Sequence, residues 1–260
     1  MNAPRPLIGS LTRSVSRPVS TQWTARKDRR PSVQAKVVPY TRRYEITWMD
    51  EAGFLEDFVR VAPAMPLFES GFNALAHGAL VATPRGHVAV EDLVPGMMIE
   101  TATGEPARLR WVGSITLVPD APNRGVPDRL YRVLADSFGF ARPAVDVTLG
   151  PGARLLDRSP EVCRQLGTEA ALVPIMARSD GEAIVEIAPV SPLRVYHLSF
   201  DEHHVINVNG LEVESFHPGP EAIYSLSDEM REQFLALFPH KRGLHEFGRM
   251  LWPRFDIAPE

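Results

Sequence analysis

The sequence predicts a mainly β protein, in which a β-hairpin precedes a compact β domain and a short helical extension follows it. The first observation is residues 71–113, where short apolar runs are separated by turns that contain Pro or Gly. The second is an alternating pattern on both sides of a turn at residues 50–53, which is typical of a hairpin. The third is a helical repeat of apolar residues that begins only after residue 220.

Residues 1–43 form a basic arm, with ten Lys or Arg residues and one acidic residue. The rest of the chain holds 18 basic and 31 acidic residues, so its charge is opposite in sign. The arm contains five prolines and no sustained apolar period, and we expect it to be disordered and solvated. Contact with nucleic acid or an anionic surface is the less favoured alternative.

The hairpin is expected over residues 44–66, with packing rather than binding as the role of Trp48, Phe54 and Phe58. The β domain follows over residues 72–220. Its first strands are expected at 79–82, 88–90 and 97–100. Further along, we expect a strand at 130–134, a helix at 160–166 and a strand at 171–177.

Residues 221–260 are expected to be helical and to pack on the β domain. Ser227 or Asp228 can cap a helix, and Pro239 stops it. Its apolar stripe consists of Met230, Phe234, Leu237 and Phe238.

The single cysteine, Cys163, excludes an internal disulfide and a zinc site built from cysteines. It falls on the expected helix 160–166, where a small apolar role is favoured over a nucleophilic one. No window of about 18 apolar residues is long enough to span a membrane. We therefore expect a cytoplasmic protein without a transmembrane segment or a secretory signal.

The β domain carries a motif, Gly78-x-x-Val81-x-Thr83-x-x-Gly86, followed by Val-Glu-Asp-Leu-x-Pro-Gly at residues 90–96. Together with the Trp-Val-Gly step at 111–113, it resembles the opening of a Hint domain, the fold of inteins and of the self-cleaving half of Hedgehog proteins, in its bacterial branch. The resemblance implies a Cys or Ser nucleophile four residues before Gly78. That position is Ala74.

A second motif, residues 146–156, resembles the family phrase that ends in Pro-x-His-Arg. Pro151 and Arg154 keep its frame. The resemblance implies a His that polarises the peptide bond under attack, and a Ser or Thr three residues before it. Those positions are Ala153 and Gly150.

A third motif, residues 195–216, resembles the closing strands of the family, aligned on Asn209-Gly210. This alignment places the family's Asp at His197 and its His at His204. The terminal His-Asn pair of splicing inteins falls on Glu214 and Ser215, so cyclisation of an Asn is not available.

Other chemistry is less favoured. The histidines at 197, 203, 204 and 217 raise the question of a metal site, but strand alternation sends His203 and His204 to opposite faces. Asp201, Ser215 and His217 are the residue types of a hydrolase triad, without a nucleophile-elbow motif. We therefore expect neither a metal nor a cofactor.

The sequence thus predicts a Hint-type protein without self-cleavage, acting as a structural unit or as a binding module for a protein partner. The vestigial site that we expect consists of Ala74, Ala153, His197, His204 and Ser215. The alternative is an autoprocessing domain that uses a non-standard nucleophile. Fragments that end near residue 73 or 215 would distinguish this alternative.

Overall fold

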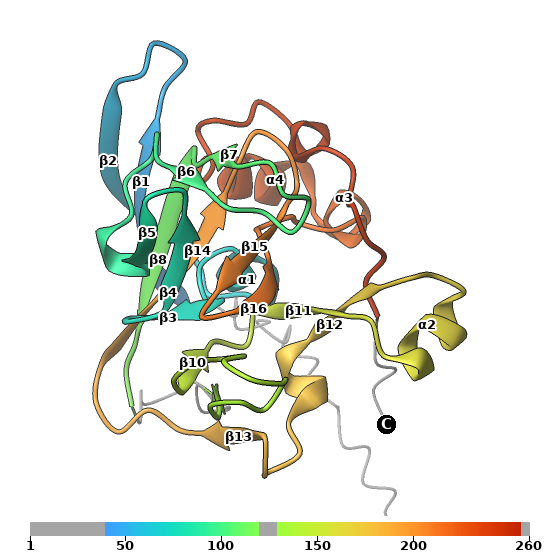
Figure 1. Cartoon of the computed structure of the whole chain (residues 1–260). Helices are drawn as coiled ribbons and strands as arrows, with labels where there is room; N and C mark the ends of the chain where they lie inside the picture. The colour runs from blue at the N-terminus through green and yellow to red at the C-terminus, as the bar shows by residue number, and fades with distance from the viewer. Residues whose placement is uncertain (1–39, 120–128, 256–260) are drawn as a thin grey trace, which may run out of the picture. The chain divides into compact units, whose positions relative to one another are not determined.

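The computed structural model describes residues 40–119 and 129–255. The expected basic arm therefore lies outside the described residues, apart from residues 40–43. The described chain is mainly β, as predicted, and its strand pairs are antiparallel (Figure 1). Among these residues no helix is both long and apolar enough to cross a bilayer.

The larger sheet has eight strands in the order β13-β9-β10-β3-β14-β8-β1-β2. Their bounds are β1 Thr41–Met49, β2 Leu55–Pro63, β3 Leu75–Ala76, β8 Trp111–Leu117, β9 Leu130–Val133, β10 Val147–Leu149, β13 Ile184–Ile187 and β14 Leu193–Ser199. The short strand β3 therefore lies in the interior of this sheet, between β10 and β14.

A second sheet has six strands in the order β12-β11-β16-β15-β4-β5. Their bounds are β4 Leu80–Thr83, β5 Gly86–Ala89, β11 Arg154–Asp157, β12 Ala171–Pro174, β15 Val205–Val208 and β16 Leu211–Glu214. A separate pair is formed by β6 Met98–Ile99 and β7 Ala107–Arg108.

The helices are short. They are α1 Pro66–Ser70, α2 Pro160–Leu166, α3 Glu221–Ser225 and α4 Asp228–Leu235, with 3-10 turns at Val90–Asp92, Ile175–Arg178 and Leu244–Phe247. The expected helix 160–166 is confirmed as α2, and the thiol of Cys163 on it donates a hydrogen bond to the Glu169 carbonyl at 3.2 Å. Ser227 caps α4 by accepting a hydrogen bond from the Met230 N–H.

Several element boundaries differ from the sequence expectations. The strands expected at 79–82, 88–90 and 97–100 are Leu80–Thr83, Gly86–Ala89 and Met98–Ile99, and the helix expected to reach Pro239 ends at Leu235. The hairpin begins at Thr41 rather than Tyr44, because residues 41–43 pair with 61–63 and Arg42 forms an ion pair of 2.6 Å with Glu69. The strand expected over 171–177 ends at Pro174, where the missing N–H stops the ladder and a 3-10 turn follows.

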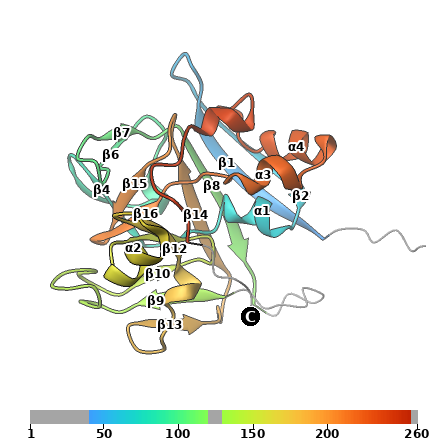
Figure 2. The ribbon, with the colours of Figure 1, turned by 90° about the vertical axis from the view of Figure 1, so that its right-hand side faces the viewer.

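The C-terminal segment contributes to the core, as its apolar stripe predicted. Phe234, Leu237 and Phe238 are fully buried, and the Trp111 indole N–H donates to the Leu237 carbonyl at 2.9 Å. Gly113 makes room for the indole, since a Cβ there would lie 2.1 Å from the Trp111 ring. Figure 2 shows α1, α3 and α4 gathered beside β1 and β2. Hairpin, domain and extension thus share one aromatic cluster.

Candidate functional site

The peptide bond that precedes Ala74 lies at the entrance to β3. Ala74 is fully buried. Its N–H donates to the Tyr196 carbonyl at 2.9 Å, and its own carbonyl accepts from the Gly150 N–H at 2.8 Å. Strands β14 and β10 therefore hold residue 74 from both sides. Its position is fixed by the ladder, but its side chain is only a methyl group.

A backbone donor reaches the carbonyl of this same peptide bond. The Asn73 carbonyl accepts a hydrogen bond from the Gly152 N–H at 3.2 Å. A Cβ at Gly150 would lie 1.9 Å from the Asn73 oxygen, and one at Gly152 would lie 2.1 Å from Asn73 Oδ1. Because both positions are glycine, the turn before β11 closes directly onto Asn73. Such an N–H is suited to stabilise negative charge on that oxygen.

The methyl group of Ala153 belongs to the same buried apolar cluster as Ala74. The expected position of the polarising His is therefore filled by core packing. A methyl group can neither donate nor accept a proton, so Ala153 adds nothing to the chemistry of this bond.

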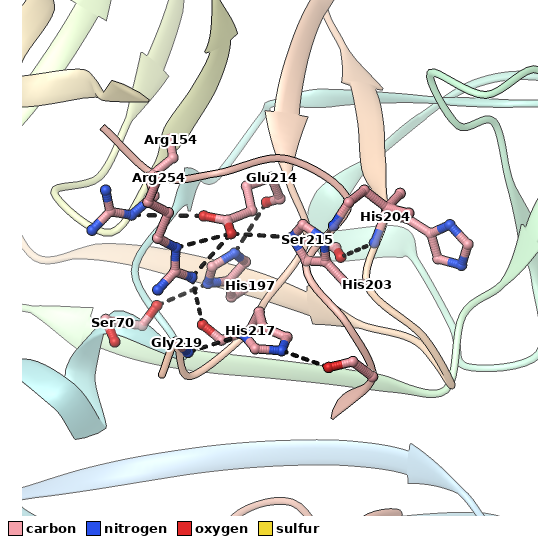
Figure 3. Close-up of polar contacts among 12 residues, drawn as sticks. Ser70, Arg154, His197, His203, His204, Glu214, Ser215, His217, Gly219 and Arg254 are labelled. Atoms are coloured by element: carbon pink, nitrogen blue, oxygen red, sulfur yellow. Dashed lines mark hydrogen bonds and ion pairs between the residues drawn. The ribbon is translucent and has the colours of Figure 1, made fainter. Parts of the chain in front are cut away.

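His197, on β14, joins two backbone segments. Its Nδ1 lies 2.8 Å from the Ser70 carbonyl and its Nε2 lies 3.3 Å from the Glu214 carbonyl (Figure 3). Burial lowers the pKa of His197. The two carbonyls act in the opposite direction, because they favour the protonated ring, but burial outweighs them. A neutral ring has only one N–H, and the shorter contact assigns it to Nδ1. The Nδ1–H therefore donates to the Ser70 carbonyl, whereas the unprotonated Nε2 faces the Glu214 carbonyl without a hydrogen bond, so His197 ties β14 to the end of α1.

Ser215 and His204 contact each other through the backbone. The buried Ser215 hydroxyl accepts from the His204 N–H at 2.9 Å, and the Ser215 N–H donates to the His204 carbonyl at the same distance. The His204 ring points away from Glu214 and His197 (Figure 3) and lies edge-on to Phe200. The structure thus places Ala74 and Ala153 in one buried apolar cluster and His197 against the Ser70 carbonyl, whereas Ser215 contacts the backbone of His204 and the His204 ring lies against Phe200.

The residue types of a hydrolase triad are not assembled. His217 Nε2 donates to the Gly248 carbonyl at 3.1 Å, and its Nδ1 accepts from the Gly219 N–H at 3.0 Å. Asp201 forms an ion pair with Arg110. Within the described ranges, no three His, Cys, Asp or Glu side chains are placed to hold a metal ion.

The strongest polar cluster of this region is centred on Glu214, which is 3% exposed at the end of β16. Its Oε1 accepts from Nε and Nη2 of Arg254, at 3.1 and 3.0 Å, and from Nε2 of His203 at 3.1 Å (Figure 3). Arg154 Nε lies 3.7 Å from the other oxygen. We name Glu214, His203, Arg254, Arg154 and His217 the Glu214 cluster.

The Glu214 cluster ties the C-terminal segment to the domain. Arg254 Nη2 also donates to the His217 carbonyl, and His203 Nδ1 accepts from the Leu251 N–H at 3.1 Å. The Leu172 N–H donates to the Pro253 carbonyl and the Phe255 N–H to the Leu172 carbonyl, at 2.8 and 2.9 Å. Residues 251–255 therefore run along the edge strand β12 and cover the buried carboxylate.

The electrostatics of the cluster follow from burial and from paired charge. Burial alone would raise the pKa of Glu214, but the Arg254 guanidinium and the His203 hydrogen bond outweigh it and lower that pKa to about 2. Burial lowers the pKa of His217 to about 4. The folded chain thus favours an ionised Glu214 and a neutral His217.

These shifts predict loss of stability in acid. Below pH 6.5 the unfolded chain protonates residue 217 while the folded chain does not, until about pH 4. Below pH 4.5 the unfolded chain likewise protonates residue 214, which stays ionised in the fold to about pH 2. The Glu214 shift alone should remove about 3 kcal/mol over its window, since one pKa unit corresponds to about 1.4 kcal/mol.

Urea unfolding between pH 7.5 and pH 3 measures this dependence. The free energy of unfolding should fall continuously with pH, and Glu214→Gln should flatten the part of the curve below pH 4.5. A curve that is level from pH 6.5 to pH 4 would contradict the assignment of His217, and one that is level from pH 4.5 to pH 3 would contradict that of Glu214.

Sequence reasoning missed Asn73, Gly152, His203 and Arg254 as members of this region. Gly152 could have been noticed, because Gly150 and Gly152 both lie within the three residues before the motif position Ala153. Arg254 lies 40 residues after Glu214, and nothing in the sequence pairs these two residues. Only the path of the C-terminal segment brings them together.

Comparison with known proteins agrees with this architecture. The Hint domain family model matches residues 73–220, more than half of the chain. Two solved structures show a weaker similarity, each at 12% identity. One is the solution structure of a bacterial intein-like domain from Clostridium thermocellum, with a TM-score of 0.39, over 56% of this chain and 99% of that one.

The other is a splice-inactive variant of the AceL NrdHF class 3 split intein, with a TM-score of 0.37, over 55% of this chain and 97% of that one. No curated protein matches the sequence. The matched span begins one residue before Ala74, includes the β3 junction and the closing strands, and ends just after Gly219. On the strength of the family model, the chain belongs to the Hint domain family.

Proposed function

We propose that this protein is a Hint-fold module that does not cleave itself and that serves as a structural unit or as a binding module for a protein partner. The observation that carries the proposal is the buried methyl group of Ala74 at the position of the nucleophile. The acyl shift of this fold requires a thiol or hydroxyl directly after the bond to be broken. Ala74 supplies neither.

Hydroxyl groups elsewhere in the region are already engaged. Ser70 Oγ donates to the Leu67 carbonyl at 2.9 Å, and Thr83 Oγ1 donates to the Gly86 carbonyl at 2.6 Å. Ser215 Oγ accepts from the His204 N–H. These contacts argue against the alternative in which a displaced nucleophile performs autoprocessing.

The retained Gly152 N–H on the Asn73 carbonyl is consistent with a scaffold that has lost its attacking group and kept its donor. Polarisation of a peptide bond by one hydrogen bond does not break it without an attacking atom. The C-terminal segment, which is held by the Glu214 cluster, supports a structural role for the residues that follow the β3 junction.

A polar cleft of about 700 Å³ supports the binding role. Its lining includes Trp48 and His240, and each of them has a buried ring nitrogen without a hydrogen-bond partner among the described residues. Such groups are suited to a polar partner, because an unpaired buried donor costs about 1–3 kcal/mol. The cytoplasmic location is part of this proposal and rests on the single cysteine.

Intact mass spectrometry of the full chain tests the absence of cleavage. After incubation with and without a thiol or hydroxylamine, we expect the wild type to keep its full mass, since no thioester or ester can form at Ala74. Fragments that end at residue 73 or 215 would overturn the proposal and favour autoprocessing.

Restoring the missing groups makes the test sharper. Ala74→Cys combined with Ala153→His should give hydroxylamine-sensitive scission before residue 74, because the Gly152 donor is in place. Ala76→Cys, a buried position two residues further along β3, is the matched control and should stay intact. Equal scission in this control would show that the thiol acts without the site.

A further inference from the structure

Strand β2 ends the eight-stranded sheet, and its outer edge faces no other strand among residues 40–119 and 129–255 (Figure 1). Apolar side chains are unusually exposed along it, with Leu55 at 52%, Val59 at 48% and Val61 at 66%. An exposed edge strand with apolar residues is a template for pairing with another chain. The question is which chain fits it.

The hydrogen bonds at both ends of the hairpin determine which residues of β2 offer their backbone to a partner. The Asp50 N–H donates to the Phe54 carbonyl, and the Ala64 N–H donates to the Tyr40 carbonyl. Since bonding alternates along an antiparallel pair, the even-numbered residues of β2 bond to β1. The odd-numbered residues, 55, 57, 59 and 61, therefore turn their N–H and C=O groups outward.

We propose that β2 pairs antiparallel with β2 of a second copy of this chain, about a two-fold axis at Phe58. This register places Leu55 opposite Val61 and residue 57 opposite residue 59 of the other copy. All four are outward-facing residues, so the ladder is complete. The same register places Glu56 opposite Arg60, once on each side of the axis, and each strand is thus complementary in charge to itself.

The charges select this register over its neighbours. Centring the pair on residue 56 or residue 60 would place two like charges directly opposite each other, which is destabilising. Centring it on residue 57 would place Glu56 opposite Phe58 and Arg60 opposite Phe54. Centring it on residue 59 would place Arg60 opposite Phe58. In neither register do Glu56 and Arg60 face each other. A shift that pairs odd with even residues would lose the ladder hydrogen bonds. Only the axis at Phe58 satisfies both the backbone and the charges.

A closed dimer follows from the geometry. Each copy contributes its single β2 edge, and an isologous contact uses that edge on both copies. Pairing covers the backbone groups of residues 55, 57, 59 and 61 and brings Leu55 and Val61 of the two copies together.

Sedimentation velocity of the full chain tests for the dimer. It is measured over a concentration series at low ionic strength, for the wild type and for variants in which the charges at residues 56 and 60 are reversed. The wild type should associate to dimers and no further. Glu56→Arg and Arg60→Glu should each weaken the dimer by about tenfold or more, since each places like charges opposite each other twice. The double exchange, E56R with R60E, should restore wild-type association.

A wild type that is monomeric throughout the series would overturn the proposal, as would a dimer that both single exchanges leave unchanged. Val59→Pro is the second variant. It removes an outward N–H that β1 does not use, so the chain should keep its wild-type melting temperature and become monomeric. A dimer that survives Val59→Pro would show that β2 is not the interface.

Discussion

Replacing Glu214 with glutamine should lower the free energy of unfolding by about 3–5 kcal/mol, because breaking one side of a buried ion pair leaves the other charge uncompensated. Here the unmatched group is the Arg254 guanidinium, whose Nε and Nη2 both donate to Glu214 Oε1. His203 would lose its carboxylate acceptor in the same substitution. Urea unfolding at pH 7 measures the loss.

Glu212→Gln is the matched control for this substitution. Glu212 lies two residues earlier on β16 and pairs with Arg158 at a partly exposed site. Exposed ion pairs contribute about 0–1 kcal/mol, so the control should stay within that range. A loss below about 1 kcal/mol for Glu214→Gln would mean that the cluster does not hold the C-terminal segment.

Gly150→Ala should cost about 3 kcal/mol or more. The added Cβ would lie 1.9 Å from the Asn73 carbonyl oxygen, which is a backbone atom held in place by the Gly152 N–H. Relief requires the turn to move away from β3, and overpacking of this kind distorts the backbone. Gly150→Thr, which restores a residue type expected in active relatives, should be worse still.

Gly243→Ala is the control for the glycine series. A Cβ at Gly243 would meet only the ring of His245, at 2.8 Å, and that exposed side chain can rotate away. We expect a change of less than about 1 kcal/mol. If Gly150→Ala unfolded at the same urea concentration as this control, the close approach of residue 150 to Asn73 would be wrong.

The site that we propose to be vestigial was predictable only in part, and Ala74 and Ala153 show why. Each occupies a motif position whose neighbours, Gly78 and Pro151, fix the alignment. The alignment also placed His204 in the site, but alternation along the chain sends its ring toward Phe200, and its neighbour His203 reaches Glu214 instead. His203 and His204 directly precede β15, and only the folded chain shows which partner each ring meets.

The sequence by itself determined the class of fold, the hairpin, the helix at 160–166 and the alanine at position 74, where the family resemblance implies an attacking group. These follow from local patterns, since turn residues, alternation and motif spacing act over a few positions. Only the tertiary structure decided that Arg254 neutralises Glu214 and that the Gly152 N–H reaches the Asn73 carbonyl. Such contacts join distant segments, and no local pattern encodes which buried charge meets which partner.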